Sequence, residues 1–417
     1  MRKIDIVIIG GGPAGMSAAV SAYRHGAEDI IILERDDGLG GILQQCIHNG
    51  FGLHKFKEEL TGPEYSHRYE AQMEEMKIPY LLNTAVLGLS PDKIVTAVNE
   101  AEGIFKIQAK TIILATGCRE RPRGALSIPG NRPAGVYSAG TAQKLVNIKG
   151  YMPGKEVVIL GSGDIGLIMA RRMTLEGAKV KAVCEIMPYS GGLARNIEQC
   201  LNDFDIPLLL SHTVVQTHGD ERLCGVTVAP VDENLKPVMT HSKYIPCDTL
   251  LLSVGLVPEN ELAKSAKIIL DPVTGGAVTD ENRQTSVGGI FSCGNALHVH
   301  DLVDYVSDEA EIAGRAAAKY IKKGDLRAAE VQIKPAKGIK YCVPQKITGT
   351  KSAKLYFRSD GVYKNVNICL TDGNHLIASA KRRKILPAQM QEIRLTSSAA
   401  AEIKGKTISL GLEEADD

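Results

Sequence analysis

The sequence lacks the features of a membrane protein, a nucleic-acid-binding protein and an exported protein. Its 417 residues contain no apolar run of the roughly 18 residues that a membrane-spanning helix needs. The formal net charge is only +1, so the overall charge favours neither nucleic acid nor an anionic membrane as a partner. The start, MRKIDIVIIGGGPAG, places cations before an apolar stretch as a signal peptide does, but that stretch is short and runs directly into glycines. We therefore expect no export signal and no transmembrane segment.

Closely spaced cysteines are also missing. The nine cysteines are an odd number, and the two nearest in sequence, Cys184 and Cys200, are sixteen residues apart. No C-x-x-C pair occurs, which excludes the usual local ligand sets for an iron–sulfur cluster or a structural zinc ion and also excludes a local redox dithiol. We expect reduced thiols, no metal site and a cytoplasmic protein.

A glycine-rich turn follows the first apolar stretch. Residues 4–9 (IDIVII) have the composition of a buried strand, residues 13–23 show helical apolar spacing, and residues 30–33 (IIIL) predict a second strand that ends at Glu34. A G-x-G-x-x-G turn between the strand and the helix of such a βαβ unit is typical of dinucleotide-binding domains. The turn glycines are Gly10, Gly12 and Gly15.

Each residue type in this turn has a physical role. The first glycine permits a tight turn, the second lets the backbone approach a pyrophosphate, and the third lets the helix pack closely on the strand. The phosphates are expected on the helix N-terminus, where unpaired N–H groups and the helix dipole favour anions. The acid that ends the second strand accepts hydrogen bonds from a ribose.

The chain repeats this unit about 150 residues later. A strand at residues 157–160 (VVIL) leads into a glycine turn, a helix through Arg172, a strand at residues 178–184, and Glu185. The spacing from the first glycine to the acid is 24 residues in both units. A chance glycine cluster would not carry its own strand, helix and acid at equal spacing, so two bound dinucleotides are expected. The second turn contains Gly161, Gly163, Asp164, Ile165 and Gly166.

The second acid also predicts which nicotinamide nucleotide binds. Glu185 would accept hydrogen bonds from the adenosine ribose hydroxyls and repel a 2′-phosphate. The three residues after it are apolar, and no arginine occurs before Arg195 to receive such a phosphate. NAD is therefore expected rather than NADP.

Four ordered motifs follow the glycine turns: GLGG at 38–41, TIILATGCRERP at 111–122, CDTLLLSVGLVPENELA at 247–263 and TSVGGIFSCGN at 285–295. With the two turns, they make residues 1–325 resemble the two-dinucleotide-binding-domain flavoproteins related to the pyridine nucleotide–disulfide oxidoreductases. The resemblance implies an α/β fold with two Rossmann-like domains. Residues 1–125 and 263–325 would form the FAD-binding domain, and residues 126–262 would form the inserted NAD-binding domain.

By the same resemblance, FAD occupies the first turn and the segments that close its domain. The late motif usually ends in Gly-Asp, whereas this chain has Gly294-Asn295. An amide still accepts a hydrogen bond from the ribityl chain, but without charge assistance, and an ordinary turn asparagine is the alternative. The helix expected at residues 301–321 would direct its positive N-terminus at the flavin. The expected FAD contacts are Gly10, Gly12, Pro13, Ala14, Gly15, Glu34, Arg35, Gly40, Gly41, Val86, Ala115, Thr116, Gly117, Gly294, Asn295 and Val303, and the expected NAD contacts are Gly161, Gly163, Asp164, Ile165, Gly166, Glu185 and Gly255.

The redox dithiol of the disulfide reductases is absent, and residues 40–56 carry one thiol and two imidazoles in its place. Cys46, with His48 nearby, is a candidate redox or acid–base group beside the flavin; a packed loop thiol is the alternative. His298 is a candidate proton donor near the flavin, although a solvated helix start fits as well. His298 and His300 have no third ligand nearby in the sequence, so they make a poor metal site.

A closer resemblance rests on GGILQQCIHNGFG, ATGCRERPRGALSIPGNRPAGVYSAGTAQ and CGNALHVHDLVDYVSDEA. It is to a branch that holds FAD subunits of opine oxidases, hydrogen cyanide synthase and dye-linked proline dehydrogenases, and oxidoreductases encoded beside anaerobic glycerol-3-phosphate dehydrogenases. It implies an FAD-dependent NAD(H) oxidoreductase that transfers hydride between nicotinamide and flavin within a larger dehydrogenase complex, acting on glycerol 3-phosphate or an amino or imino acid. The implied partners are a second flavoprotein subunit together with a small cysteine-rich subunit. The alternatives are a stand-alone NADH oxidase or single-thiol reductase using Cys46, and a flavin-binding scaffold without turnover.

The tail, residues 326–417, changes from βα alternation to a hairpin pattern. Asp360-Gly361 and Asp372-Gly373 separate runs with strand composition, which predicts two hairpins within a small all-β domain. The tail has 16 Lys and Arg against 9 Asp and Glu, a balance of +7 that leaves −6 for the rest of the chain. The run KRRK at residues 381–384 is either a solvated basic face or a docking surface for a partner.

Overall fold

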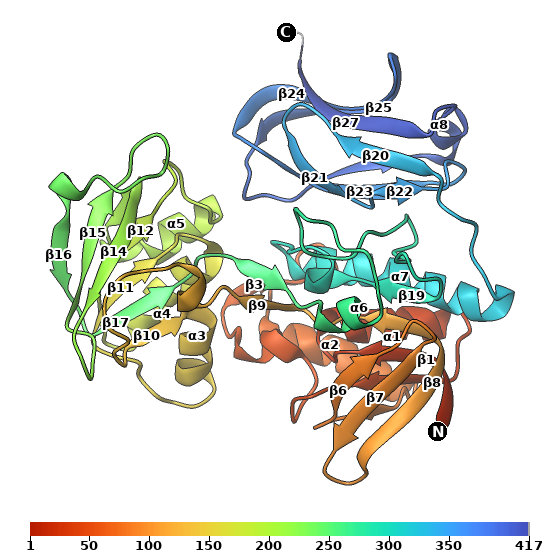
Figure 1. Ribbon diagram of the computed structural model, residues 1–417, viewed down its shortest axis with the longest axis horizontal. Coiled ribbons are helices and arrows are strands. Elements are labelled where there is room, and N and C mark those ends of the chain that lie inside the picture. The colour runs from red at the N-terminus through yellow and green to blue at the C-terminus, as the bar shows by residue number, and fades with distance from the viewer. Residues whose placement is uncertain (416–417) are drawn as a thin grey trace. The chain divides into compact units, whose positions relative to one another are not determined.

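The structure, a computed structural model, describes residues 1–415 and divides into two compact units (Figure 1). The first unit contains residues 1–118 and the chain from residue 258 onward, and the second contains residues 119–257. The expected α/β fold is confirmed, and the inserted unit begins and ends a few residues before the expected range 126–262. The chain crosses between the units through two paired strands, β9 (Cys118–Glu120) and β18 (Leu256–Pro258).

A mixed sheet of seven strands forms the centre of the first unit: β1 (Arg2–Ile9), β2 (Ile30–Leu33), β5 (Tyr80–Leu81), β6 (Ala85–Leu89), β7 (Ile94–Asn99), β8 (Gly103–Leu114) and β19 (Ile290–Ser292). The order is β5-β2-β1-β8-β7-β6, and β19 pairs with the C-terminal end of β8. The strands β5, β2, β1, β8 and β19 run parallel, whereas β7 and β6 are antiparallel additions. The sheet therefore has one edge at which the carboxyl ends of five strands meet.

Three helices share one hydrophobic core on one face of this sheet: α1 (Pro13–Arg24), α2 (Gly62–Glu75) and α7 (Val303–Lys323). Alternate residues of β1 point into this core and into a second core on the opposite face, as the strand period of two requires. Helices α1 and α7 lie side by side, because a Cβ on Gly314 would overlap the carbonyl oxygen of Ala18. The helices expected at residues 13–23 and 301–321 are confirmed to within two residues at each end.

A parallel sheet of five strands forms the centre of the second unit: β10 (Val136–Ser138), β11 (Glu156–Leu160), β12 (Lys179–Glu185), β13 (Leu208–Leu210) and β17 (Thr249–Leu252). Their order is β10-β17-β11-β12-β13. One face packs on α3 (Ala139–Asn147), α4 (Asp164–Leu175) and α5 (Ala194–Cys200), and the other packs on the antiparallel strands β14 (His212–His218), β15 (Gly225–Pro230) and β16 (Lys243–Pro246). The second βαβ unit predicted from the sequence, β11–α4–β12, is confirmed.

Two further sheets form a C-terminal β-sandwich within the first unit. One contains β20 (Val331–Pro335), β22 (Lys346–Ile347), β24 (Tyr363–Asp372), β25 (His375–Ile385) and β27 (Thr407–Glu414), and the other contains β21 (Ile339–Val343), β23 (Ala353–Ser359) and β26 (Gln391–Leu395). A short helix, α8 (Ser397–Ala401), precedes the last strand. The two sheets enclose their own hydrophobic core.

The β-sandwich is attached to the rest of the first unit through buried contacts. Tyr341 and Val343 of β21 belong to the same hydrophobic cluster as the residues of β1 and β8. The buried carboxylate of Glu281 accepts a hydrogen bond from Thr348 Oγ1 at 2.6 Å. Arg358 of β23 forms an ion pair with Asp301. The tail is therefore a β-rich domain that shares its packing with the sheet of the first unit.

One of the two predicted hairpins is wrong. Asp372-Gly373 does join a hairpin, β24 with β25, and Gly373 has the positive φ (+58°) that a two-residue hairpin loop requires. Asp360-Gly361 instead joins β23 to β24, which lie in different sheets. Gly361 lies outside the left-handed region, and β23 pairs on both sides with other strands, β21 and β26. The local turn signal could not show that both edges of β23 have other partners.

The basic run of the tail lies in β25, at the edge of its five-stranded sheet. The side chains of Lys381, Arg383 and Lys384 are exposed. Charges on an edge strand discourage pairing with another chain, so a solvated basic face is sufficient to explain this run.

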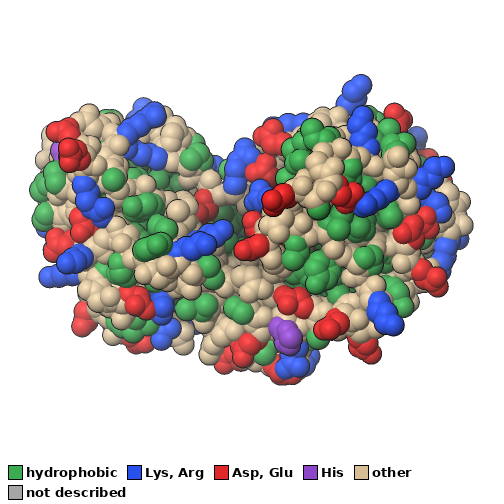
Figure 2. Space-filling model, turned by 90° about the horizontal axis from the view of Figure 1, so that it is seen from below, with side chains coloured by type: hydrophobic (Ala, Val, Ile, Leu, Met, Phe, Trp, Pro, Cys, Tyr) green, Lys and Arg blue, Asp and Glu red, His purple; other side chains and the backbone are tan. Residues whose placement is uncertain are grey.

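On the face drawn in Figure 2, acidic and basic side chains are interspersed. Among the helices of residues 1–415, none is long and apolar enough to cross a membrane.

Candidate dinucleotide-binding sites

The expected FAD-binding residues of the first unit converge at the carboxyl ends of its parallel strands. Gly10 follows β1, Glu34 follows β2, Ala115 follows β8 and Gly294 comes shortly after β19. In open parallel sheets, ligands bind outside the carboxyl ends of the strands. A Cβ on Gly294 would lie 2.8 Å from the Cβ of Ala14, so the late turn lies against the first turn of α1.

The first glycine turn is tightly packed on one side and open on the other. Gly10 has φ +108°, and a Cβ there would overlap the carbonyl oxygen of Ala115. A Cβ on Gly15 would overlap the carbonyl oxygen of Gly10. By contrast, a Cβ on Gly12 would meet no atom within 4 Å. Gly12 is the N-cap of α1 and no side chain caps this helix, so the open space faces N–H groups that can bind a phosphate.

The second glycine turn has the same geometry. Gly161 has φ +100°, and a Cβ there would overlap the carbonyl oxygen of Ser253. A Cβ on Gly166 would press on the carbonyl oxygen of Gly161, whereas a Cβ on Gly163 would meet only Ser253 Oγ, at 3.8 Å. Gly163 is the N-cap of α4, which also has no side-chain cap. Each unit therefore offers one open helix N-terminus suited to a pyrophosphate.

The two predicted acids hold their turns in the same way. The Glu34 carboxylate accepts hydrogen bonds from the backbone N–H groups of Gly11 at 2.6 Å and Asp36 at 2.8 Å. The Glu185 carboxylate accepts from Ser162 N at 2.9 Å, Ser162 Oγ at 2.7 Å and Met187 N at 3.0 Å. In both units, one carboxylate oxygen accepts a hydrogen bond from the backbone N–H of the residue between the first two glycines. The other oxygen accepts one from the backbone N–H of the residue two positions after the acid. Each carboxylate is thereby fixed beside its turn.

A glycine pair beside each turn extends the repeat. In the first unit, Gly40 and Gly41 follow Glu34 by six and seven residues, and Gly40 N donates to the carbonyl oxygen of Gly11 at 2.9 Å. In the second unit, Gly191 and Gly192 follow the acid at the same spacing, and Gly191 N donates to Ser162 Oγ at 3.1 Å. Only the first pair was among the predicted contacts, although the equal spacing was visible in the sequence.

The other predicted contacts lie around the turns. The Asp164 carboxylate accepts from Leu193 N at 2.8 Å and Asn196 Nδ2 at 2.6 Å, which ties the second glycine pair's loop to α4. Thr84 N donates to the carbonyl oxygen of Glu34 at 2.8 Å, so β6 with Val86 begins beside the first acid. Pro13 and Ile165 lie in the first turns of α1 and α4, and Arg35 follows Glu34 with an exposed side chain. Thr116, Gly117 and Gly255 lie beside the crossing strands β9 and β18.

The loop with the candidate thiol is folded against α2 and α7. Cys46 Sγ donates to the carbonyl oxygen of Ile42 at 3.3 Å, and burial raises the pKa of this thiol to about 12. His48 packs on Phe51, with 5.0 Å between the ring centroids. The thiol of Cys46 is therefore protonated at neutral pH.

An acid that was not among the predicted site residues holds this loop in place. The buried carboxylate of Asp304, in the first turn of α7, accepts hydrogen bonds from Gly52 N at 3.3 Å and Lys55 N at 2.7 Å. Lys55 Nζ also pairs with Asp308 at 3.0 Å and Glu311 at 2.7 Å. The N-terminal turns of α7, which include Val303, therefore carry the segment between the glycine-rich loop and α2. An acid on a helix N-terminus was visible in the sequence, but its loop partners were not.

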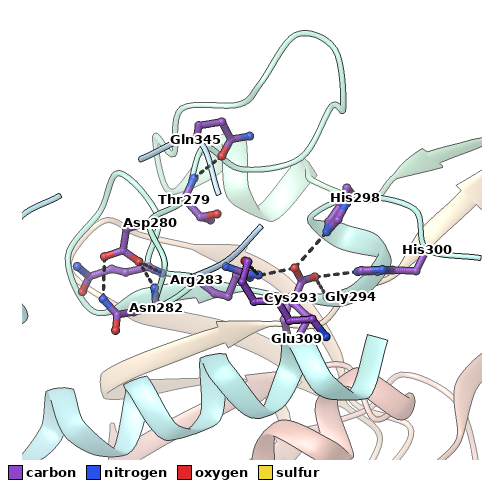
Figure 3. A network of polar contacts seen from close by, with 12 residues as sticks. Thr279, Asp280, Asn282, Arg283, Cys293, Gly294, His298, His300, Glu309 and Gln345 are labelled. Atoms are coloured by element: carbon purple, nitrogen blue, oxygen red, sulfur yellow. Dashed lines mark hydrogen bonds and ion pairs between the residues drawn. The ribbon is translucent and has the colours of Figure 1, made fainter. Parts of the chain in front are cut away.

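The late turn and its two histidines lie inside the protein. Asn295 Oδ1 accepts a hydrogen bond from His300 N at 3.0 Å, and its amide lies 3.6 Å from Cys118 Sγ. His298 and His300 are buried, and the Nε2 atom of each lies 3.1 Å from the carboxylate of Glu309 (Figure 3). The sequence shows no third ligand next to this histidine pair, but the fold adds a carboxylate to it. Glu309 comes from the second turn of α7, and the fold brings it back to both rings.

These features define a class of protein: an α/β protein with two open dinucleotide turns, each with its own acid. A protein-family model described as pyridine nucleotide-disulphide oxidoreductase matches residues 4–317, and the chain belongs to this family.

Two curated relatives and one solved structure illustrate the similarity. Hydrogen cyanide synthase subunit HcnB of Pseudomonas protegens is 28% identical over 285 residues, covering 63% of this chain and 58% of that protein. An opine oxidase subunit from Agrobacterium tumefaciens is 25% identical over 336 residues, covering 75% and 64%. The fold is similar to that of T. acidophilum thioredoxin reductase, with a TM-score of 0.63 and 23% identity, covering 76% of this chain and 99% of that one. The chain thus spans less than two thirds of the two curated relatives.

The residues present fit the cofactors of this family, which binds FAD and uses NAD(P)H. A Cβ on Gly12 or Gly163 would meet no atom closer than 3.8 Å, so the backbone is open there to a pyrophosphate, and Glu34 and Glu185 are fixed beside these turns, as a ribose-binding acid requires. When bound, the flavin supplies the hydride chemistry. The chain's own groups would then bind the phosphates at the two helix N-termini and hold the riboses through the two acids.

Proposed function

We propose that this protein is an FAD-dependent oxidoreductase that transfers hydride between NAD(H) and flavin, as the electron-transferring subunit of a larger dehydrogenase complex. The duplicated turn carries the proposal. Each unit has an open glycine turn, a fixed acid and a glycine pair at the same spacing. A protein that binds a single dinucleotide has no need of the second set.

The second set favours NAD over NADP. Both oxygens of the Glu185 carboxylate are held by backbone and hydroxyl donors, which keeps the charge at the ribose position. A 2′-phosphate there would meet this carboxylate and no cation in the loop that follows, up to Arg195. NADH therefore reduces the flavin faster than NADPH does.

The raised pKa of the partly buried Cys46 thiol argues against a single-thiol reductase. A reactive cysteine needs thiolate character, whereas the pKa of Cys46 is raised to about 12 by burial. The remaining alternative, a flavin-binding scaffold without turnover, does not explain why the chain has a second open dinucleotide turn. We therefore assign the redox chemistry to the flavin alone.

The role within a complex rests on what the relatives are called. Both curated relatives described above are named as subunits of larger enzymes. By analogy, we propose a second flavoprotein dehydrogenase subunit that oxidises glycerol 3-phosphate or an amino or imino acid, together with a small cysteine-rich subunit. None of the nine cysteines forms a disulfide bond within residues 1–415, which suits the reducing cytoplasm that we propose as the location.

Anaerobic stopped-flow spectroscopy tests the proposal. The purified protein should release a non-covalent yellow flavin on acid precipitation. NADH should bleach the bound flavin at least about tenfold faster than NADPH, since a tenfold ratio corresponds to about 1.4 kcal/mol, the energy expected for one unfavourable charge contact. A flavin that neither nucleotide bleaches would leave the scaffold as the answer. Co-purification from the native host then identifies the partner subunits, and a protein that elutes alone with full NADH oxidase activity would refute the role within a complex.

A further inference from the structure

The buried carboxylate of Glu309 is the centre of a polar network with four donors (Figure 3). Arg283 Nε lies 2.9 Å from Glu309 Oε1, and His298 Nε2 lies 3.1 Å from the same oxygen. His300 Nε2 lies 3.1 Å from Oε2, and Gly294 N donates to Oε2 at 3.0 Å. The Arg283 and Glu309 side chains have no exposed surface. A charge pair this deeply buried requires the hydrogen bonds that surround it.

The protonation of the network follows from its partners. Burial by itself raises the pKa of the Glu309 carboxyl, but the facing His298, His300 and Arg283 hold it well below its ordinary value. Burial lowers the pKa of His298 to about 4 in spite of Glu309, so this imidazole is neutral at pH 7. A carboxylate only accepts hydrogen bonds, so the hydrogen of each ring is on Nε2. The buried group therefore combines the Arg283 cation and the Glu309 anion with the neutral ring of His298.

A metal ion fits this cluster poorly. The nearest ligand atoms of His298, His300 and Glu309 lie within 4.8 Å of one another, which is close enough for a metal site. However, metal-bound histidines donate their other ring nitrogen to a partner, and neither Nδ1 atom has a partner in the part of the chain that the structure describes. The Arg283 guanidinium already neutralises the carboxylate, so a divalent cation would add uncompensated buried charge.

The network fixes the late turn at the flavin-binding edge. The bond from Gly294 N to Glu309 holds the first residue of the turn, and this residue lies against Ala14 of α1. The second residue, Asn295, accepts from the backbone N–H of His300, whose ring is held by Glu309. Glu309 therefore acts on both residues of the turn, once directly and once through His300.

The C-terminal β-sandwich closes the other side of the network. Arg283 Nη2 donates to the carbonyl oxygen of Lys354 in β23 at 3.2 Å. The Arg283 guanidinium lies over the ring of Tyr356, with 5.8 Å from its central carbon to the ring centroid. The same ring lies 5.4 Å from that of His300 and 5.8 Å from that of His298, centroid to centroid. Residues of β23 therefore cover the guanidinium and both imidazoles on this side.

We propose that Glu309 is a positioning residue for the flavin, and that it makes FAD binding and docking of the C-terminal β-sandwich one coupled event. The carboxylate aligns the Gly294-Asn295 turn only while Arg283 and the histidines are held on its far side. The β-sandwich supplies that support through Lys354 and Tyr356. FAD bound at the turn, in return, stabilises the closed network.

A double-mutant cycle tests the coupling to the turn. In Glu309→Gln the amide keeps one acceptor oxygen and turns an NH₂ group toward donors, so the deflavinated protein should bind FAD at least tenfold more weakly. Asn295→Ala should also weaken binding. If Glu309 acts through the turn, the FAD affinity of the double variant is at most about threefold lower than that of whichever single variant binds FAD less tightly. If instead the double variant loses FAD affinity by the product of the two single losses, as is found for distant independent sites, the proposal is overturned.

A matched control separates this effect from a general loss of carboxylate charge. Glu402→Gln makes the same chemical change in an exposed pair with His375 of the β-sandwich, and it should leave FAD affinity unchanged. A Glu309→Gln protein that binds FAD as tightly as Glu402→Gln would overturn the proposal.

A second measurement uses the unaltered chain, so it does not depend on a variant that folds. Hydrogen exchange of the β23 amides is compared in the FAD-bound protein, after FAD removal, and after FAD is added back. Coupling predicts at least tenfold faster exchange without FAD and full recovery when it is returned. Equal protection of β23 in all three states would show that the β-sandwich docks independently of the flavin, and the proposal would fall.

Discussion

Replacing Glu185 by glutamine removes the charge at the second ribose position while keeping the size of the side chain. The carboxylate accepts three hydrogen bonds, from Ser162 N at 2.9 Å, Ser162 Oγ at 2.7 Å and Met187 N at 3.0 Å. Hydrogen bonds to a charged group contribute about 1.5–3 kcal/mol, against about 0.5–1.5 kcal/mol for neutral pairs. Because the ribose hydroxyls are also expected to donate to this carboxylate, we expect the Glu185→Gln protein to bind NADH about tenfold more weakly, which corresponds to about 1.4 kcal/mol.

The same change should favour NADPH. Two unit charges 4 Å apart repel by about 4 kcal/mol at an effective dielectric constant of 20, and solvent at the site reduces this value. If about a third of the repulsion is relieved, NADPH binds roughly tenfold more tightly. The ratio of the two affinities should then shift by about a hundredfold toward NADPH.

The assay is the nucleotide dependence of flavin bleaching in anaerobic stopped flow, with each nucleotide titrated separately. Glu176→Gln, which alters an exposed carboxylate paired with Arg172 at 2.6 Å in the same unit, serves as the control and should leave both titrations unchanged. A Glu185→Gln protein whose NADH-to-NADPH ratio stays within about twofold of the unaltered protein would refute the assignment of this acid to the ribose.

Four further outcomes follow from the structure. Gly12→Ala should fold normally but lose FAD, because its Cβ meets no protein atom but would occupy the side of the turn where the pyrophosphate is expected. Gly15→Ala should unfold at lower temperature because its Cβ overlaps the protein backbone; thermal melts and flavin content distinguish the two variants. A chain ending at Lys323 should be insoluble or flavin-free, since it exposes the cluster that β21 shares with β1 and β8; a soluble yellow product would contradict this packing. Cys46→Ser should keep its FAD and its rate of reduction by NADH, because the pKa of the thiol is raised to about 12; a slower reduction rate would restore Cys46 as a redox group. Burial lowers the pKa of His298 to about 4 from its ordinary value of 6.5, so the folded state binds fewer protons than the unfolded state between these values. The free energy of unfolding should therefore fall by about 1.6 kcal/mol from pH 6.5 to pH 5, and denaturant unfolding at the two pH values should show a smaller fall for His298→Asn.

The two nucleotide-binding units could be predicted because their signals are local. A run such as residues 30–33 shows its buried strand in four consecutive apolar residues, and all four are buried as β2, directly before Glu34. The tight packing around Gly10 and Gly15 is likewise encoded within the G-x-G-x-x-G segment and confirmed by the overlaps that a Cβ would cause. The contacts of each turn's glycines lie within its βαβ unit of about 30 residues, apart from those with one later parallel strand, which ends just before Ala115 in the first unit and Ser253 in the second.

The network around Glu309 could not be predicted because the contacts that enclose it on the side of the β-sandwich join residues distant in sequence, although the four donors to Glu309 itself lie only 9 to 26 residues from it. Arg283 meets Lys354 across 71 residues, and Arg358 meets Asp301 across 57. Each of these residues is an ordinary charged side chain in its local context, and only tertiary packing shows that Arg283 is fully buried. The same limitation explains the wrong hairpin at Asp360, because a strand's local sequence does not reveal which neighbours occupy its two edges.

Helix α7 has a consequence for how proteins of this kind can exchange their parts. Its first turn holds the loop before α2 through Asp304, its second turn carries Glu309, and its outer face meets Lys354 of the β-sandwich through Asp308 at 3.5 Å. A tail transplanted from a relative would therefore have to bring a carbonyl for Arg283 and an aromatic ring over the histidines. Recombination of such tails is therefore constrained from inside the flavin-binding domain, and a substitution of Tyr356 in β23 can select a compensating change at Arg283, some seventy residues away.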